Sequence, residues 1–135
     1  MSDYVITSGL TPEETIKALN EIAMSNDNTT GVKHDGEKPD MSLLSSIAIT
    51  KVADVMTFGK RKYSANNWRG GIVYSRLLAA ALRHIFAYLG GESIDPESGK
   101  SHLAHAVCCL CMILEFEETR PDLDDRYKKP ETKVS

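Results

Sequence analysis

The stretch RHIFAYLGGESIDPESGKSHLAH, residues 83–105, indicates two helices joined by an acidic turn. Apolar residues recur at helical spacing before and after it, and two adjacent glycines end the first of these segments. Three carboxylates and three histidines fall within the stretch: Glu92, Asp95, Glu97, His84, His102 and His105. Such a group at a junction between two amphipathic helices can hold a hard divalent cation. We therefore expect the functional side chains to lie at this junction.

Periodicity and capping signals predict the other helices. Residues 11–14, TPEE, have the pattern of a capping box and begin a helix that ends by Ser25. Apolar residues spaced by three and four predict a second helix over 42–63 and a third from about residue 74 to the glycines at 90 and 91. A fourth helix follows, capped by Asp95 or Ser101. No alternating strand pattern is present, so we predict an all-α fold, a bundle of four to five helices.

Length and composition indicate a single domain. The chain has 135 residues, a hydrophobic content of 41% and a formal net charge of −3. We predict a flexible N-terminus over 1–10, a helical catalytic domain over 11–118 and a charged tail over 119–135. No segment has the length and apolarity of a membrane span or the pattern of a signal peptide, so a soluble cytoplasmic protein without membrane partners is expected. The negative net charge argues against nucleic acid as a partner.

The last helix carries an apolar stripe and a group of cysteines. We expect Leu103, Val107 and Leu110 to face the core, which would point His102 and His105 into a groove about 100° away. The thiols at positions 108, 109 and 111 lack the second pair that a metal site would need, and are predicted to be buried core thiols.

The acidic turn is the predicted metal site. Magnesium prefers oxygen ligands, and Glu92, Asp95 and Glu97 supply them. Imidazole is a poor magnesium ligand, so the histidines are candidates for phosphate contacts, orientation or general base catalysis, although manganese would relax this constraint. The alternative interpretation is that the three carboxylates only solvate a loop, with Asp95 as a helix cap.

A tryptophan and several lysines lie among glycines and asparagines elsewhere in the chain. Trp68 is either a core anchor or a stacking surface for a base. Lys33, Lys38 and the basic run at 60–62 are either exposed to solvent or in contact with phosphates. Spacing alone does not choose between these interpretations.

Three segments of the chain resemble one known family. GVKHDGEKPDMSLL (31–44), FGKRKYSANNWRGG (58–71) and RHIFAYLGGESIDPESGKSHLAHA (83–106) together look like the phage dATP/dGTP diphosphohydrolases, a MazG-like group that includes the MazZ enzymes. The resemblance covers roughly residues 31–118 and implies the all-α fold of the nucleoside triphosphate pyrophosphatases. It implies cleavage of a purine deoxynucleoside triphosphate into monophosphate and pyrophosphate, with two or more Mg²⁺ or Mn²⁺ ions as cofactor. Assembly into dimers or tetramers is also implied, as is a role in supplying dGMP to phages that use 2-aminoadenine.

The resemblance also implies roles for individual residues. The cations would be held by Glu92, Asp95 and Glu97, and a carboxylate, His102 or His105 would take the proton of the attacking water. The residues expected to contact the phosphates or the purine are Lys33, Lys38, Lys62, Asn67, Trp68, Arg83 and His84. The chain departs from the wider superfamily in one respect. Residues 92–95 match its E-x-x-D motif, but the third helix has no E-x-x-E.

Two other functions compete with this interpretation. Helical HD phosphohydrolases also act on dNTPs, but they need an adjacent His-Asp pair on a helix, and His34-Asp35 lies in a predicted loop. These enzymes would release triphosphate instead of pyrophosphate. A non-enzymatic helical module that binds a protein or a nucleotide would hydrolyse no dNTP at all.

Overall fold

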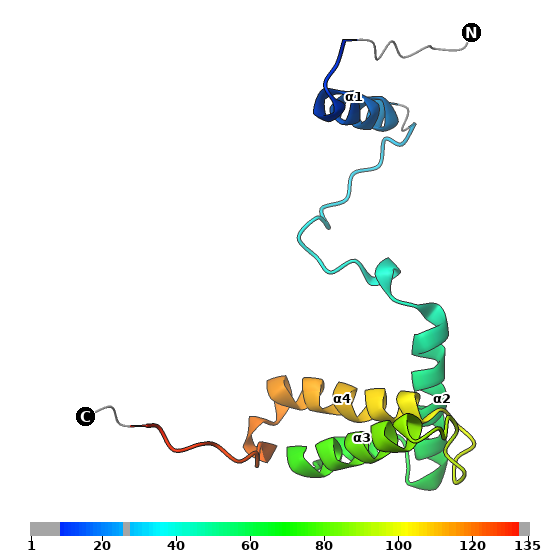
Figure 1. Ribbon diagram of the computed structural model, residues 1–135, viewed down its shortest axis with the longest axis vertical. Coiled ribbons are helices and arrows are strands. Elements are labelled where there is room, and N and C mark those ends of the chain that lie inside the picture. Colours follow the sequence, from blue (N-terminus) through cyan, green and yellow to red (C-terminus); the bar gives the residue numbers. More distant parts are fainter. Residues whose placement is uncertain (1–8, 26–27, 133–135) are drawn as a thin grey trace. The chain divides into compact units, whose positions relative to one another are not determined.

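The structure, a computed structural model, describes residues 9–25 and 28–132, with the side chains of 22–25 excepted. The described part of the chain contains four α-helices: α1 (Pro12–Ser25), α2 (Ser46–Lys62), α3 (Tyr74–Leu89) and α4 (His102–Thr119) (Figure 1). Short 3₁₀ turns cover Met41–Leu43, Asn67–Gly70 and Pro121–Leu123. No β-strand occurs within these described ranges, so the predicted all-α fold is confirmed.

The chain divides into an N-terminal unit, Met1–Pro39, and a C-terminal unit, Asp40–Ser135. The domain boundaries given above, with one domain over 11–118, remain a prediction. Of the predicted flexible segment over 1–10, residues 1–8 lie outside the described part of the chain.

In the N-terminal unit, α1 begins with the predicted capping box. The backbone N–H of Thr11 donates to Glu14 Oε2 at 3.1 Å, and the N–H of Glu14 donates to Thr11 Oγ1 at 3.1 Å. Two N–H groups that the first helical turn leaves without a partner are thereby satisfied.

In the C-terminal unit, α2 begins later than the sequence suggested. Asp40 caps the 3₁₀ turn, since its carboxylate accepts the N–H of Ser42 at 3.0 Å. Ser45 then caps α2, because its Oγ accepts the N–H of Ala48 at 3.2 Å. Residues 42–45 therefore lie outside α2, although the prediction placed them in the helix.

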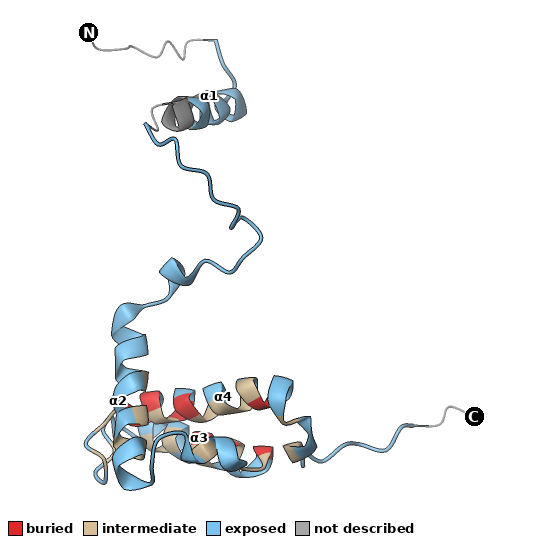
Figure 2. Cartoon of the chain, turned by 180° about the vertical axis from the view of Figure 1, so that it is seen from behind, coloured by how far each residue is buried: buried red, intermediate tan, exposed pale blue. Residues whose placement is uncertain are grey.

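The helices α3 and α4 lie side by side in antiparallel orientation, and α2 also packs against α4 (Figure 1). One core cluster joins Val55 of α2 to Ala104 and Cys108 of α4. A second joins Tyr74 and Leu77 of α3 to Phe116, whose side chain is fully buried. Figure 2 shows several buried positions, in red, along α4.

The face of α4 that was expected to pack against the core is exposed instead. Leu103, Val107 and Leu110 are each more than 40% exposed, while His102 is only 4% exposed. Alanines and a cysteine, which let the neighbouring helices approach closely, lie on the buried side: Ala104, Ala106 and Cys108. Because α4 is apolar on nearly all sides, the pattern of large residues does not reveal its inner face.

The three cysteines of α4 differ in burial according to the face on which they lie. Cys108 is buried, and burial raises the pKa of its thiol to about 12. Cys109 is half-buried, whereas Cys111 is exposed. The prediction of buried thiols was therefore wrong for Cys111.

Residues 120–125 pack back onto α3. The Tyr74 hydroxyl donates to the backbone oxygen of Arg120 at 3.4 Å. Asp125 accepts the backbone N–H of Ser75 at 2.8 Å and also bonds the Ser75 hydroxyl. The N-cap residue of α3, Val73, has no capping side chain, so Asp125 satisfies a helix N-terminus from fifty residues away.

Asp125→Ala is expected to lower the urea midpoint of unfolding, because it leaves this N–H of α3 without an acceptor. Asp125→Asn should keep most of the stability, since its carbonyl oxygen still accepts. The hydrogen bonds from Ser75 lower the pKa of Asp125 below 3.8, so its charged form is favoured in the folded state. The contribution is therefore present above pH 4 and is lost as the pH falls through the lowered pKa. An alanine variant with an unchanged midpoint would contradict this role.

Candidate active site

The turn between α3 and α4 is held by its own backbone hydrogen bonds. Gly91, with φ of +99°, lets the chain leave α3 in a conformation that other residues rarely adopt. The N–H of Asp95 donates to the oxygen of Lys100 at 2.8 Å, and the N–H of His102 donates to that of Ser93 at 3.1 Å. These bonds fix the acidic residues of the turn relative to the first residues of α4.

Three histidines meet where this turn joins α3 and α4. His102 Nε2 lies 2.6 Å from Glu92 Oε1, and its Nδ1 lies 2.8 Å from His84 Nδ1. The rings of His84 and His105 stack, with centroids 4.4 Å apart and an angle of 10° between their planes. The sequence predicted these residues as functional, and the structure brings all four into one cluster.

A second chain of hydrogen bonds runs through a serine that the sequence reading overlooked. Asp95 Oδ2 accepts from the Ser98 hydroxyl at 2.7 Å and from its backbone N–H at 3.1 Å. Ser98 Oγ in turn lies 2.7 Å from His105 Nε2. Aspartate followed by serine three residues later is a capping pattern, which could have identified Ser98.

The electrostatics of the cluster favour neutral histidines. Burial lowers the pKa of His84 below 6.5, and the neighbouring rings of His105 and His102 lower it further. Burial also lowers the pKa of His105, although the charge of Asp95 opposes this. Burial acts to raise the pKa of Asp95, but the hydrogen bonds from Ser98 outweigh it and lower that pKa. At neutral pH the cluster therefore holds a carboxylate beside two uncharged imidazoles.

A cavity of about 860 Å³ adjoins the cluster. Its walls come from the second half of α2, the loop after it, both α3 and α4, and the acidic turn. Drug-sized and nucleotide-sized ligands occupy cavities of about 300–1,000 Å³. Eight of the residues predicted from the sequence line it: Lys62, Asn67, Trp68, Arg83, His84, Asp95, Glu97 and His105.

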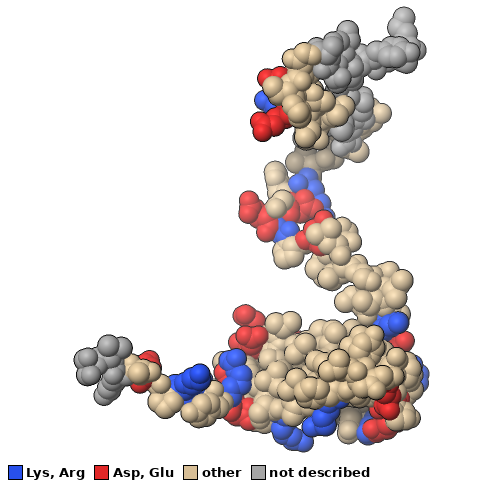
Figure 3. Space-filling view, in the orientation of Figure 1, with Lys and Arg blue, Asp and Glu red and all other residues tan. Residues whose placement is uncertain are grey.

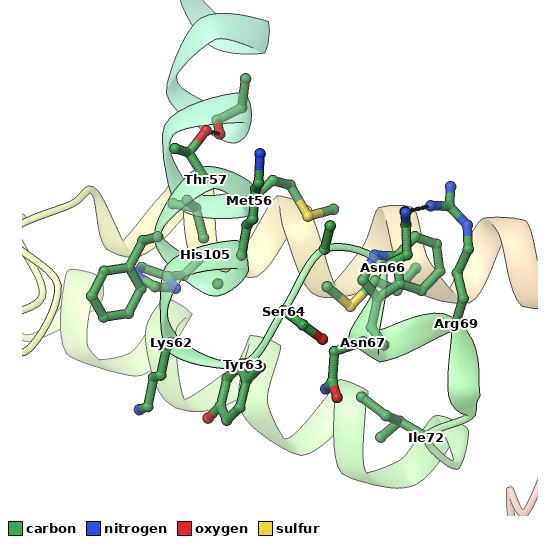
Figure 4. A pocket seen from close by; sticks show the side chains of 18 of the residues that line it. Met56, Thr57, Lys62, Tyr63, Ser64, Asn66, Asn67, Arg69, Ile72 and His105 are labelled. Atoms are coloured by element: carbon green, nitrogen blue, oxygen red, sulfur yellow. Dashed lines mark hydrogen bonds between the residues drawn. The ribbon is translucent and has the colours of Figure 1, made fainter.

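Cations, carboxamides and apolar side chains line the cavity. Figure 4 shows Lys62 and His105 on one side and Asn66, Asn67, Arg69 and Ile72 on the other. Lys60 and Arg83 add further cations to the lining, and Trp68 and Met112 add apolar groups. Anionic groups would be favoured beside the cations, and a flat heterocycle against the apolar groups.

Several lining residues already have partners. Lys62 forms an ion pair with Glu97, so a phosphate would have to displace this carboxylate. Trp68 packs against Phe116, and the Arg69 guanidinium lies 4.4 Å above its ring. Arg69 is itself bound by both carboxylate oxygens of Glu115, at 2.9 and 3.0 Å. The Trp68 ring thus has the core-anchor role considered above, and one of its faces is covered.

The predicted three-carboxylate metal site does not form one ligand set in this arrangement. Glu92 is bound to His102, Asp95 to Ser98 and Glu97 to Lys62. Within the described part of the chain, no group of three or more His, Cys, Asp or Glu side chains is placed to hold a metal ion. Glu92 is also absent from the cavity wall. The use of Mg²⁺ or Mn²⁺ stays a prediction.

The remaining predicted residues lie in the N-terminal unit. Lys33 is exposed and forms an ion pair with Asp35 at 3.4 Å, and Lys38 ends a turn by donating its N–H to the oxygen of Asp35. His34 lies in the same segment, which has no helix. The pair His34-Asp35 therefore lacks the helical setting that HD chemistry would require. The proposed phosphate contacts of both lysines stay predictions.

Comparisons with known proteins identify the family of this chain. Residues 28–126 match the family model described as dATP/dGTP diphosphohydrolase, N-terminal. A dATP/dGTP diphosphohydrolase of Salmonella phage PMBT28 is 37% identical over 97 residues, covering 72% of this chain and 33% of the phage protein. The chain thus spans about a third of the length of this relative. No solved structure matches significantly. Across the described residues, no helix is long and apolar enough to cross a membrane. By the family match over residues 28–126, the chain belongs to the dATP/dGTP diphosphohydrolase N-terminal family.

Proposed function

We propose that the C-terminal unit binds a purine deoxynucleoside triphosphate in the cavity and hydrolyses it to the monophosphate and pyrophosphate. The observation that carries this proposal is the cavity itself, which is lined by cations and carboxamides and has two rings of the histidine cluster, His84 and His105, in its wall. The name of the phage relative supports the substrate class. We further propose dGTP as the main substrate and dATP as a second one, in nucleotide-pool remodelling for 2-aminoadenine DNA.

The cavity suggests how the nucleotide would lie. Lys62 and Arg83 would neutralise the phosphates, with Lys62 exchanging its carboxylate partner for a phosphate oxygen. Asn67 would read the purine edge, because its carboxamide has no hydrogen-bond partner among the described residues. The α-phosphate would then lie between these ends, next to the histidines, where water can attack it in line.

Product analysis with each dNTP in the presence of Mg²⁺ or Mn²⁺ tests this function. We expect dGMP or dAMP together with pyrophosphate, and loss of turnover when EDTA is added, because a triphosphate reacts as its complex with a divalent cation. Release of inorganic triphosphate and a nucleoside would favour HD-type chemistry. Absence of hydrolysis with every dNTP and either metal would favour the non-enzymatic module.

We also propose that the chain forms homo-oligomers, dimers or tetramers. Large apolar side chains at helical spacing are exposed on α3 and α4: Leu82, Phe86, Leu89, Leu103, Val107, Leu110 and Leu114. Figure 3 shows few charged side chains across the middle of the α3–α4 body. Stripes of this kind are typical of surfaces that another chain covers.

Phe86→Glu combined with Leu114→Glu is expected to convert the assembly into monomers, because both charges would be buried against the second copy. Size-exclusion chromatography with light scattering measures the mass directly. Lys51→Glu, which changes charge at an exposed position of α2, should leave the oligomer intact. A wild-type chain that is monomeric at every concentration would contradict the proposal.

A further inference from the structure

The buried ring of His102 uses both of its nitrogens. It is 4% exposed, with Nε2 at 2.6 Å from Glu92 and Nδ1 at 2.8 Å from His84. A carboxylate can only accept, so the hydrogen of the first bond belongs to His102 Nε2. A neutral imidazole has one N–H, which leaves His102 Nδ1 as an acceptor. The hydrogen between the two rings must then belong to His84 Nδ1.

These hydrogen positions determine what His84 can do. With its proton on Nδ1, the neutral ring carries its lone pair on Nε2. His84 lines the cavity, and its Nε2 has no hydrogen-bond partner among the described residues. A basic nitrogen is therefore available at the cavity wall, fixed in one tautomer by a buried neighbour.

We propose that Glu92, His102 and His84 form a proton relay, in which His84 Nε2 is the general base and the other two residues position it and share its charge. The proposal rests on the proposed hydrolysis and assigns the base within that site. Sequence reasoning considered His102 and His105 for this role. His102 has no free nitrogen. His105 Nε2 is hydrogen-bonded to Ser98, so only Nδ1 of His105, which lies next to the backbone of that residue, is left.

Each bond and each proton can be followed through the proposed hydrolysis. The water oxygen bonds to the α-phosphorus while one water proton passes to His84 Nε2. The bond from the α-phosphorus to the bridging oxygen breaks, and its electron pair leaves with pyrophosphate. The proton on His84 Nδ1 can shift to His102 Nδ1, which moves the positive charge beside the Glu92 carboxylate. The acquired proton passes to pyrophosphate before this product leaves, or to solvent afterwards.

Titratable and charged groups on the neighbouring elements surround this relay. Arg83 on α3, His105 on α4 and Asp95 in the turn act on His84. Glu97, which pairs with Lys62 of α2, acts on His105. The stacked ring of His105 makes a charge on His84 unfavourable, and burial lowers the pKa of His84 as well. Transfer of the charge to His102 relieves this repulsion and places it against a carboxylate.

Tautomers can be measured without activity. In the ¹⁵N-histidine-labelled full chain at pH 7.5, long-range ¹H–¹⁵N correlation should show His84 as the Nδ1–H tautomer and His102 as the Nε2–H tautomer. His84→Gln and His102→Gln assign the signals. A wild-type spectrum with His84 protonated on Nε2 would overturn the relay even if the enzyme hydrolyses dGTP.

The Glu92→Gln variant tests the positioning role of Glu92. It removes the carboxylate but keeps the size of the side chain. Its carboxamide can donate as well as accept, so it no longer fixes the hydrogen on His102 Nε2, and the tautomer of His84 is no longer fixed through His102. We expect kcat to fall by about 10- to 100-fold with little change in KM. Long-range ¹H–¹⁵N correlation should show that His84 and His102 no longer populate a single tautomer each.

Glu118→Gln is the matched control, because Glu118 is exposed near the other end of α4. It should leave kcat and both histidine tautomers unchanged. Loss of kcat in Glu92→Gln with both tautomers unchanged would show a merely structural role and overturn the relay. If the wild type hydrolyses no dNTP, the proposed function and the catalytic role of His84 both fail, while the tautomers still decide whether the hydrogen-bonded chain exists.

Discussion

Replacing Asp95 with asparagine is expected to lower kcat for dGTP by about 10²- to 10³-fold, because it disturbs the groups that position the histidine cluster at the cavity wall. Asp95 lines the cavity and accepts two hydrogen bonds from Ser98, which in turn binds His105. Asparagine has one acceptor oxygen and an NH₂ group that meets the Ser98 hydroxyl as a competing donor. The bond to His105 is then lost or reversed, and the charge opposite this ring disappears. Steady-state kinetics with a pyrophosphate assay measures the effect.

Far-UV circular dichroism should show unchanged helix content, which would exclude unfolding of the variant as the cause of the lower kcat. Asp54→Asn supplies a matched control, since it makes the same chemical change at an exposed position of α2 outside the cavity wall. Its kcat should equal that of the wild type. An Asp95→Asn enzyme with full turnover would remove the Asp95–Ser98–His105 chain from the mechanism.

Phe116→Ala is expected to lower the free energy of unfolding by about 3–5 kcal/mol, a large share of the stability of a small domain. The side chain is only 1% exposed and packs against Tyr74, Leu77 and Trp68. Truncation leaves a void among rings and aliphatic groups that cannot close without moving α3. Urea unfolding followed by circular dichroism gives the value.

Tyr127→Ala removes an aromatic ring that is 84% exposed, and should change the stability by less than about 0.5 kcal/mol. Because Trp68 lines the cavity, Phe116→Ala should also weaken nucleotide binding. A Phe116→Ala protein as stable as the Tyr127→Ala protein would show that this core is formed by other contacts.

Helix ends were predicted well because their signals are local. The capping box before α1, the glycines after α3 and the serine before α4 each act within a few residues, and the structure shows all three. The start of α2 was predicted too early, because Asp40 caps a 3₁₀ turn and the α-helical cap belongs to Ser45. Because two capping residues lie close together, the sequence alone does not show which of them begins the α-helix.

The inner face of α4 could not be predicted from the sequence. Its large aliphatic residues and its small residues lie on different sides, and both sides are apolar. Which of the two faces of α4 is buried, the one with large residues or the one with small residues, depends on how closely the partner helices approach. Burial of His102 follows from this choice, and so does the relay proposed above.

The sequence by itself determined the helices, the acidic turn and the identity of the side chains gathered there. These follow from capping, periodicity and residue type, which act over short distances along the chain. Only the tertiary structure decided the partners of side chains that lie far apart along the chain: Glu92 with His102, and Glu97 with Lys62. Hydrogen bonds act only within about 3 Å, so residues 10 to 35 positions apart are paired by the packing of helices and not by spacing.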